Sequence, residues 1–262
     1  MSADFSKEPK ANNHPSTSLR AGKLTTDLGG PARIILAAFG IFIISQFVAV
    51  FLVQVGLYFT RANQSIDQSA AAQFFYILLA EGAAIGSIYW LLKRRGLTLS
   101  AIGIGRKLAW RDFKWAIAGF LAFYGLVVAV TVLLTIFIPS FDADQAQDVG
   151  FNYLSTPLDQ IIALVALVAL PSIGEEILMR GYLYSGLRLR LTFFPAMIIT
   201  SLLFGAAHLT TGVEGALWAA GVSTFILSVV LVYLRERTGA LYAPIMVHGL
   251  NNLVAFLVHF HG

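Results

Sequence analysis

Seven apolar stretches, most of them close to the thickness of a lipid bilayer in length, constrain this chain more than any other feature. They cover residues 34–59, 70–92, 115–138, 161–187, 194–208, 216–234 and 241–260. A helix of about 20 apolar residues crosses the hydrocarbon core of a bilayer, and only the fifth stretch, at about 15 residues, falls short. The chain is therefore predicted to be an all-α polytopic membrane helix bundle of about seven transmembrane helices.

Composition supports a membrane protein and excludes several other classes. Of the 262 residues, 57% are hydrophobic and 12% are charged, and the mean hydropathy is +0.75. Soluble domains carry about 25% charged residues, so a soluble globule is not expected. The chain has no cysteine, which excludes disulfides, thiolate nucleophiles and cysteine-ligated metals. We expect the net charge of +4 to reflect the orientation of the chain in the membrane. The lipid bilayer is expected as a partner, and nucleic acid is not.

The first 33 residues differ in kind from the rest. They are polar, rich in Ser, Asn, Pro and Lys, and contain no apolar stretch. Residues 1–33 are predicted to form a disordered cytoplasmic tail rather than a signal peptide, because no apolar core with a small-residue cleavage site follows the start. Residues 34–262 are predicted to form one transmembrane domain.

The distribution of Lys and Arg predicts the orientation. These residues gather before the first apolar stretch and after the second, fourth and sixth, whereas residues 139–160 contain four Asp and no Lys or Arg. Positively charged loops stay in the cytoplasm. Seven spans with a cytoplasmic N-terminus satisfy this alternation, which also supports the short fifth span.

The fourth stretch contains the motif EEILMR at residues 175–180. Each ionisable group within a span costs about 2.5 to 3.5 kcal/mol to insert, so these side chains need partners or a water-filled cavity. Glu176 and Arg180 are four residues apart on a helix, in the favourable order for an ion pair. Glu175 is rotated by about 100° from Glu176 and points elsewhere.

Two later stretches carry further polar residues. FGAAH spans residues 204–208 and HGLNN spans residues 248–252, so Phe204 shares a helix face with His208, and His248 with Asn252. At about 1.5 Å per residue, Glu175, both histidines and Asn252 lie about 16 to 22 Å from the cytoplasmic ends of their spans. The sequence therefore predicts that three helices bring a carboxylate, two imidazoles and a carboxamide to one layer. Glu81 lies near the same layer, where a structural role is favoured over lining the site.

These motifs resemble those of the CPBP (Abi) family of intramembrane proteases. EEILMR matches EExxxR, FGAAH matches FxxxH and HGLNN matches HxxxN, in the order found in that family, which includes the type II CAAX prenyl endopeptidases. The motif-bearing core covers about residues 155–258, and residues 97–115 resemble the family's cytoplasmic loop.

The resemblance implies peptide-bond hydrolysis within the membrane, near the C-terminus of membrane proteins or lipidated, CAAX-like peptides. Glu175 and His208 are expected to activate water, and His248 and Asn252 to donate hydrogen bonds to the oxyanion. Supporting roles are expected for three further residues. Glu176 and Arg180 would fix the helix face that presents Glu175, and Phe204 would brace the imidazole of His208.

Several alternatives stay open. We expect no catalytic metal, because a Glu–His pair can activate water alone; zinc held by Glu175, His208 and His248 is the alternative. Rival functions are a transporter or proton-relay protein, and a non-catalytic immunity or scaffold member of the same family. The multi-pass protein is expected in the plasma membrane of a prokaryote or the endoplasmic reticulum of a eukaryote. The substrate, its prenylation and the oligomeric state are not predicted.

Overall fold

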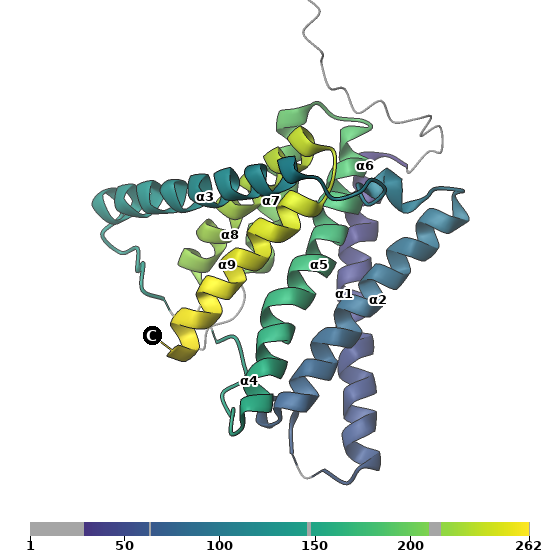
Figure 1. Ribbon diagram of the computed structural model, residues 1–262, viewed down its shortest axis with the longest axis vertical. Helices are drawn as coiled ribbons and strands as arrows, with labels where there is room; N and C mark the ends of the chain where they lie inside the picture. Colours follow the sequence, from purple (N-terminus) through teal and green to yellow (C-terminus); the bar gives the residue numbers. More distant parts are fainter. Residues whose placement is uncertain (1–28, 63, 146–147, 210–215, 262) are drawn as a thin grey trace, which may run out of the picture.

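The computed structural model describes residues 29–62, 64–145, 148–209 and 216–261, and all regular structure in these ranges is helical. The elements, in chain order, are α1 (Pro31–Phe59), η1 (Ile66–Gln68), α2 (Ala70–Arg94), η2 (Leu99–Ile102), α3 (Trp110–Phe137), α4 (Pro157–Leu164), η3 (Val165–Ala169), α5 (Leu170–Glu176), η4 (Ile177–Tyr184), α6 (Ser185–Arg188), α7 (Phe193–Ala207), α8 (Trp218–Thr238) and α9 (Tyr242–His261). Figure 1 shows their arrangement. The predicted all-α bundle is confirmed.

Length and composition make this an integral membrane protein. In the described part of the chain, six helical segments are long and apolar enough to cross a membrane, and the shorter apolar α7 joins them. Their outer surface carries large apolar side chains, including Leu36 at 69% exposure, Phe47 at 71% and Phe137 at 76%. Lipid is the solvent that accepts such a surface.

The boundary of the predicted tail needs one correction. We expected the tail to extend to residue 33, but α1 begins at Pro31. Proline suits the first turn of a helix, because its fixed φ is helical and its missing N–H would have no partner there. Residues 1–28 of the predicted tail lie outside the described residues.

The fourth apolar segment, from α4 to α6, is interrupted twice by π-helical turns. The first turn, η3, precedes α5, and the second, η4, follows it. Each π-turn inserts one extra residue per turn and rotates the side chains that follow, and such turns occur frequently at functional sites. The short helix α5, which ends with Glu175 and Glu176, is thus set between two irregular turns.

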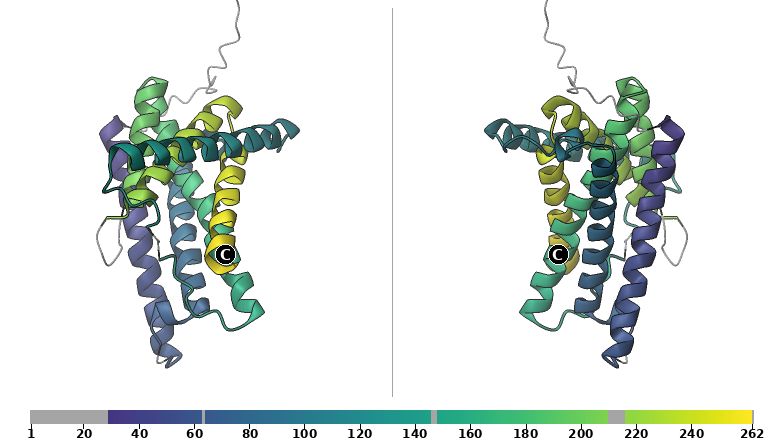
Figure 2. Two further views of the ribbon diagram at one scale, coloured as in Figure 1. Left: turned by 90° about the vertical axis from the view of Figure 1, so that its left-hand side faces the viewer. Right: turned by 90° about the vertical axis from the view of Figure 1, so that its right-hand side faces the viewer.

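The direction of α3 differs from that of its neighbours. Figures 1 and 2 show α3 lying across the bundle, whereas α1, α2, the segment α4–α6 and α9 run along it. The first half of α3 packs on α8 and α9 through Ala116, Gly119 and Phe123, which are buried. Its second half, up to Phe137, is largely exposed and apolar.

The basic loops meet at one end of the molecule. Arg111 in the first turn of α3 donates to the carbonyl oxygen of Thr238 at 2.8 Å, which joins the start of α3 to the end of α8. The carboxylate of Glu236 accepts from Arg188 at 2.8 Å, which joins the end of α8 to the end of α6. Loops that the sequence assigns to the cytoplasm therefore share one side, the top of Figure 1.

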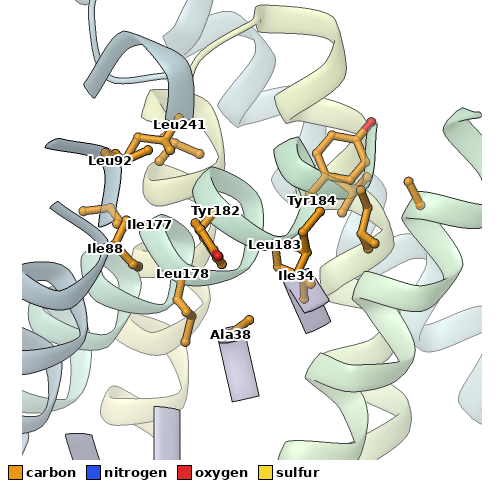
Figure 3. Packing of buried hydrophobic residues seen from close by; sticks show 14 residues of the cluster. Ile34, Ala38, Ile88, Leu92, Ile177, Leu178, Tyr182, Leu183, Tyr184 and Leu241 are labelled. Carbon is orange, nitrogen blue, oxygen red and sulfur yellow. The ribbon is translucent and has the colours of Figure 1, made fainter. Parts of the chain in front are cut away.

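An apolar core anchors the π-turn η4. Figure 3 shows side chains of η4 packed between residues of α1 and α2. The labelled residues are Ile34, Ala38, Ile88, Leu92, Ile177, Leu178, Tyr182, Leu183, Tyr184 and Leu241. Because α5 continues directly into η4, this core also fixes the position of the two glutamates.

Candidate functional site

A buried ion pair lies at the centre of the site. The Nη1 atom of Arg180 donates to Oε1 of Glu176 at 2.8 Å, and neither side chain is exposed to solvent. The sequence predicts this pair from the i, i+4 spacing. Glu176 has a second partner that the spacing does not reveal, since its Oε1 also lies 2.9 Å from Nδ1 of His248 on α9. Glu176 therefore joins the first and third motifs.

This contact orients the imidazole of His248. An ionised carboxylate only accepts hydrogen bonds, so with Glu176 ionised Nδ1 of His248 carries a proton. In neutral His248, Nε2 is then the unprotonated nitrogen. That atom faces Glu175, at 3.9 Å from its Oε2. The two adjacent glutamates thus lie on opposite sides of one imidazole.

Glu175 differs from Glu176 in its surroundings. Its side chain is 27% exposed, whereas that of Glu176 is fully buried. Oε2 of Glu175 is shielded from solvent and accepts no hydrogen bond from the described residues. The gap of 3.9 Å between Oε2 of Glu175 and Nε2 of His248 is too long for a direct hydrogen bond, and it is a separation that one bridging water about 2.8 Å from each atom would span.

Phe204 connects the second motif to the other two. Its ring lies 4.8 Å from the ring of His208 and 5.8 Å from that of His248, measured between centroids. The guanidinium carbon of Arg180 lies 4.5 Å from the centroid of Phe204, in a cation–π arrangement. The buried aromatic ring therefore contacts both imidazoles and the buried cation.

His208 also has a defined tautomer. It follows the last residue of α7, and its Nδ1 lies 2.9 Å from the carbonyl oxygen of Phe204. Since a carbonyl oxygen only accepts, Nδ1 is the donor, and neutral His208 presents an unprotonated Nε2. The local fold thus leaves this nitrogen free in both histidines.

Asn252 donates a hydrogen bond to the backbone of the fourth segment close to Pro171. Pro171 has no N–H, so it cannot donate a hydrogen bond to a backbone carbonyl one turn earlier. Leu167 is four residues before Pro171, and its carbonyl oxygen accepts a hydrogen bond from Nδ2 of Asn252 at 3.2 Å. One N–H of the carboxamide is then engaged with the backbone, and its second N–H remains for another acceptor.

We predict that this hydrogen bond and Pro171 are energetically coupled. Asn252→Leu should lower the free energy of unfolding by about 1 to 3 kcal/mol, because the carbonyl of Leu167 loses its partner. In a Pro171→Ala background the loss should be smaller, since the substituted alanine supplies an N–H to the helix. Thermal unfolding of the four proteins in one detergent measures the coupling, and equal losses in both backgrounds would contradict it.

The structure brings the three motifs together. The imidazole of His248 lies beside Glu175, and the ring of Phe204 contacts both His208 and His248. The predicted cooperation of Glu175 with His208 in activating water stays a prediction. The catalytic roles of these residues stay predictions. One neighbour was not anticipated: Asn251, whose Oδ1 accepts from the hydroxyl of Tyr124 at 3.4 Å.

The zinc alternative involves the same three residues, Glu175, His208 and His248. In the described ranges, no group of three or more His, Asp or Glu side chains is arranged to hold a metal ion. As they lie here, Glu175, His208 and His248 do not fit that role together. A chelator added to the cleavage assay measures metal dependence directly.

Comparison with known proteins bears directly on this site. Residues 157–254 match the family model described as type II CAAX prenyl endopeptidase Rce1-like. This region is similar to the Rce1-like family. The match confirms the relationship that the three motifs indicate, and it includes all three motifs of the site. The Rce1-like family is a protease family, which supports a hydrolase at the level of the family. Comparison with curated proteins and with solved structures gave no match.

Proposed function

We propose that this protein is an intramembrane endopeptidase in which Glu175 activates a water molecule. The observation that carries the proposal is the position of its carboxylate, 3.9 Å from the free nitrogen of His248 and with one oxygen that accepts no hydrogen bond from the described residues. Glu176, by contrast, is neutralised by Arg180 and oriented towards the other nitrogen of His248. Of the two glutamates, Glu175 is the one available as a base.

The reaction follows from this arrangement. A water held between Glu175 and His248 loses a proton to Glu175 as its oxygen attacks the carbonyl carbon of the scissile bond. The charge that develops on the carbonyl oxygen needs preorganised donors, for which the second N–H of Asn252 is the candidate. The imidazoles of His208 and His248 are donors to that oxygen only in the form that carries a proton on Nε2. The carbon–nitrogen bond then breaks, and the amine leaves with a proton.

The substrate proposed for this site is the C-terminal part of a membrane protein or of a lipidated, CAAX-like peptide. The support is the Rce1-like match of the region that carries the site, together with the apolar helices that surround it. We further propose that the site opens towards the end where the basic loops meet, and that this end is cytoplasmic. The membrane is the plasma membrane in a prokaryote and the endoplasmic reticulum in a eukaryote.

A panel of quenched fluorescent peptides tests this function. The purified protein in proteoliposomes is given matched peptides with and without a prenyl group, each with and without a chelator. We expect cleavage of at least one peptide and survival of activity under the chelator. Loss of activity under the chelator would overturn the metal-free mechanism, and cleavage of plain peptides alone would overturn the lipidated substrate. If no peptide is cleaved, the proposal fails and proton transport becomes the leading alternative.

A further inference from the structure

A chain of hydrogen bonds leads from α3 to Asn252, the candidate donor to the oxyanion. The hydroxyl of Tyr124 on α3 donates to Oδ1 of Asn251 on α9 at 3.4 Å. Nδ2 of Asn251 in turn donates to Oδ1 of Asn252 at 3.4 Å. Nδ2 of Asn252 donates to the carbonyl oxygen of Leu167 in η3 at 3.2 Å. Four groups from three segments are therefore linked by consecutive contacts.

The carbonyl of Leu167 determines the direction of this chain. A backbone carbonyl only accepts, so the carboxamide of Asn252 turns its NH2 group towards Leu167 and its oxygen towards Asn251. Asn251 must present its own NH2 group to that oxygen, which turns the oxygen of Asn251 towards Tyr124. Each carboxamide thus has one orientation that makes all the contacts, and the hydroxyl of Tyr124 is the last donor.

Aromatic neighbours fix the position of Tyr124. Its ring packs edge to face with the rings of Phe120 and Phe123, each at 4.9 Å between centroids. Phe123 is buried in the apolar core that α3 shares with α8 and α9. The hydroxyl of Tyr124 is therefore held at the contact between α3 and α9.

Asn252 lies next to the reacting groups. It is one helical turn after His248, and the Cβ atoms of residues four apart on a helix are about 5 to 6 Å apart. Nε2 of His248 lies 3.9 Å from Oε2 of Glu175. The direction of the second N–H of Asn252 follows from the orientation of its carboxamide, which Leu167 holds on one side and Asn251 on the other.

We propose that Asn251 and Tyr124 are positioning residues that hold the carboxamide of Asn252 in the orientation that binds the oxyanion, an inference that rests on the proposed protease function. Both act through Asn252 and not on the substrate. A donor that is already oriented needs no reorganisation as the charge develops. Without the hydroxyl of Tyr124, Asn251 loses its outer partner, and Asn252 is held less closely. Because this loss affects the transition state, kcat should fall while KM does not change.

Tyr124→Phe tests this role, because it removes the hydroxyl and keeps the ring. We expect kcat for peptide cleavage to fall about 3- to 10-fold, the typical effect of one hydrogen bond, with KM and the unfolding temperature unchanged. Tyr233→Phe on α8 is the matched control. The ring of Tyr233 packs on Trp115 at 6.2 Å, away from this chain, so the control should keep the wild-type kcat. A wild-type kcat for Tyr124→Phe would overturn the proposal.

A thioamide substrate distinguishes positioning from a general effect on the fold. Sulfur is a weak acceptor, so a peptide with sulfur in place of the scissile carbonyl oxygen depends less on the oxyanion donor. Tyr124→Phe should therefore slow cleavage of the amide peptide more than cleavage of the thioamide. Equal losses for the two substrates would show that the hydroxyl does not act through the oxyanion donor.

A double-mutant cycle tests whether Tyr124 acts through Asn251. Asn251→Ala removes the link between Tyr124 and Asn252, so adding Tyr124→Phe should cause no further loss of kcat. The same loss from Tyr124→Phe in both backgrounds would contradict the proposal. Should Asn251→Ala fail to fold, the ratio of amide to thioamide cleavage by Tyr124→Phe decides; should the wild-type protein not cleave the thioamide, the cycle decides.

The outcomes separate this inference from the proposed function. If the wild-type protein cleaves the peptide and Tyr124→Phe cleaves it equally well, the protein is a protease in which Tyr124 has no positioning role. If Asn252→Ala keeps the wild-type kcat, Asn252 is not the oxyanion donor, and the inference fails while the protease function stands. If the wild-type protein cleaves no peptide, the protease function itself fails, and the inference fails with it.

Discussion

Glu175→Gln is expected to lower kcat/KM for peptide cleavage about 10²- to 10⁴-fold, the range typical for loss of a general base. Glutamine fills the same volume but cannot take a proton from water. Because the side chain is 27% exposed and one of its oxygens accepts no hydrogen bond from the described residues, the amide should not destabilise the fold. Initial cleavage rates across a range of peptide concentrations, with thermal unfolding of the same samples, measure both effects.

The control for this substitution is Glu236→Gln. Glu236 is also a glutamate within a membrane-spanning helix, but it accepts from Arg188 and Tyr184 at the basic end of α8. Removing its charge should leave cleavage nearly unchanged. The account is contradicted if the Glu175 and Glu236 variants lose activity equally, or if the Glu175 variant stays active while folded.

Arg180→Met is expected to destabilise the protein by about 3 to 5 kcal/mol, the cost typical of removing one partner from a buried ion pair. The fully buried Glu176 would keep only His248 as a partner. The cation over the ring of Phe204 would also be lost. Thermal unfolding in detergent should show a marked decrease in the unfolding temperature, with lower yield of folded protein.

A double variant separates charge from packing at this position. Glu176→Leu combined with Arg180→Met replaces both buried charges by apolar groups, which is often neutral or stabilising for buried ion pairs. The double variant should regain much of the lost stability, yet stay poorly active because His248 has lost its orienting carboxylate. Equal stability of the single and double variants would show that the ion pair does not act as a unit.

Local spacing made part of this site predictable from the sequence. The pair of Glu176 and Arg180 follows from their separation of four residues on a helix, and the structure has it at 2.8 Å. The contact of Phe204 with His208 follows from the same rule. Apolar stretches of spanning length predicted the helices, because in lipid the hydropathy of a segment determines its structure more directly than in water.

Tertiary contacts account for what the sequence did not reveal. Which glutamate binds His248 depends on the rotation of α5 between two π-turns, and a regular helix does not predict that rotation. The carboxyl group of Glu81 on α2 lies against the backbone of α5 because Gly174 has no side chain there. The sequence does not show this role of Gly174, since it depends on α2 and α5 being neighbours. The direction of α3 is likewise set by its packing on α8 and α9.

Cleavage of one peptide in water enriched in ¹⁸O tests the central claim most directly, because the proposed reaction transfers a water oxygen to the new carboxylate. The products formed by the wild-type and Glu175→Gln proteins are identified by mass spectrometry. The account predicts a single cleavage site, one ¹⁸O in the new C-terminal carboxylate, and little or no product from the variant. Intact peptide with the wild-type protein, product without ¹⁸O, or equal product from both proteins would contradict it.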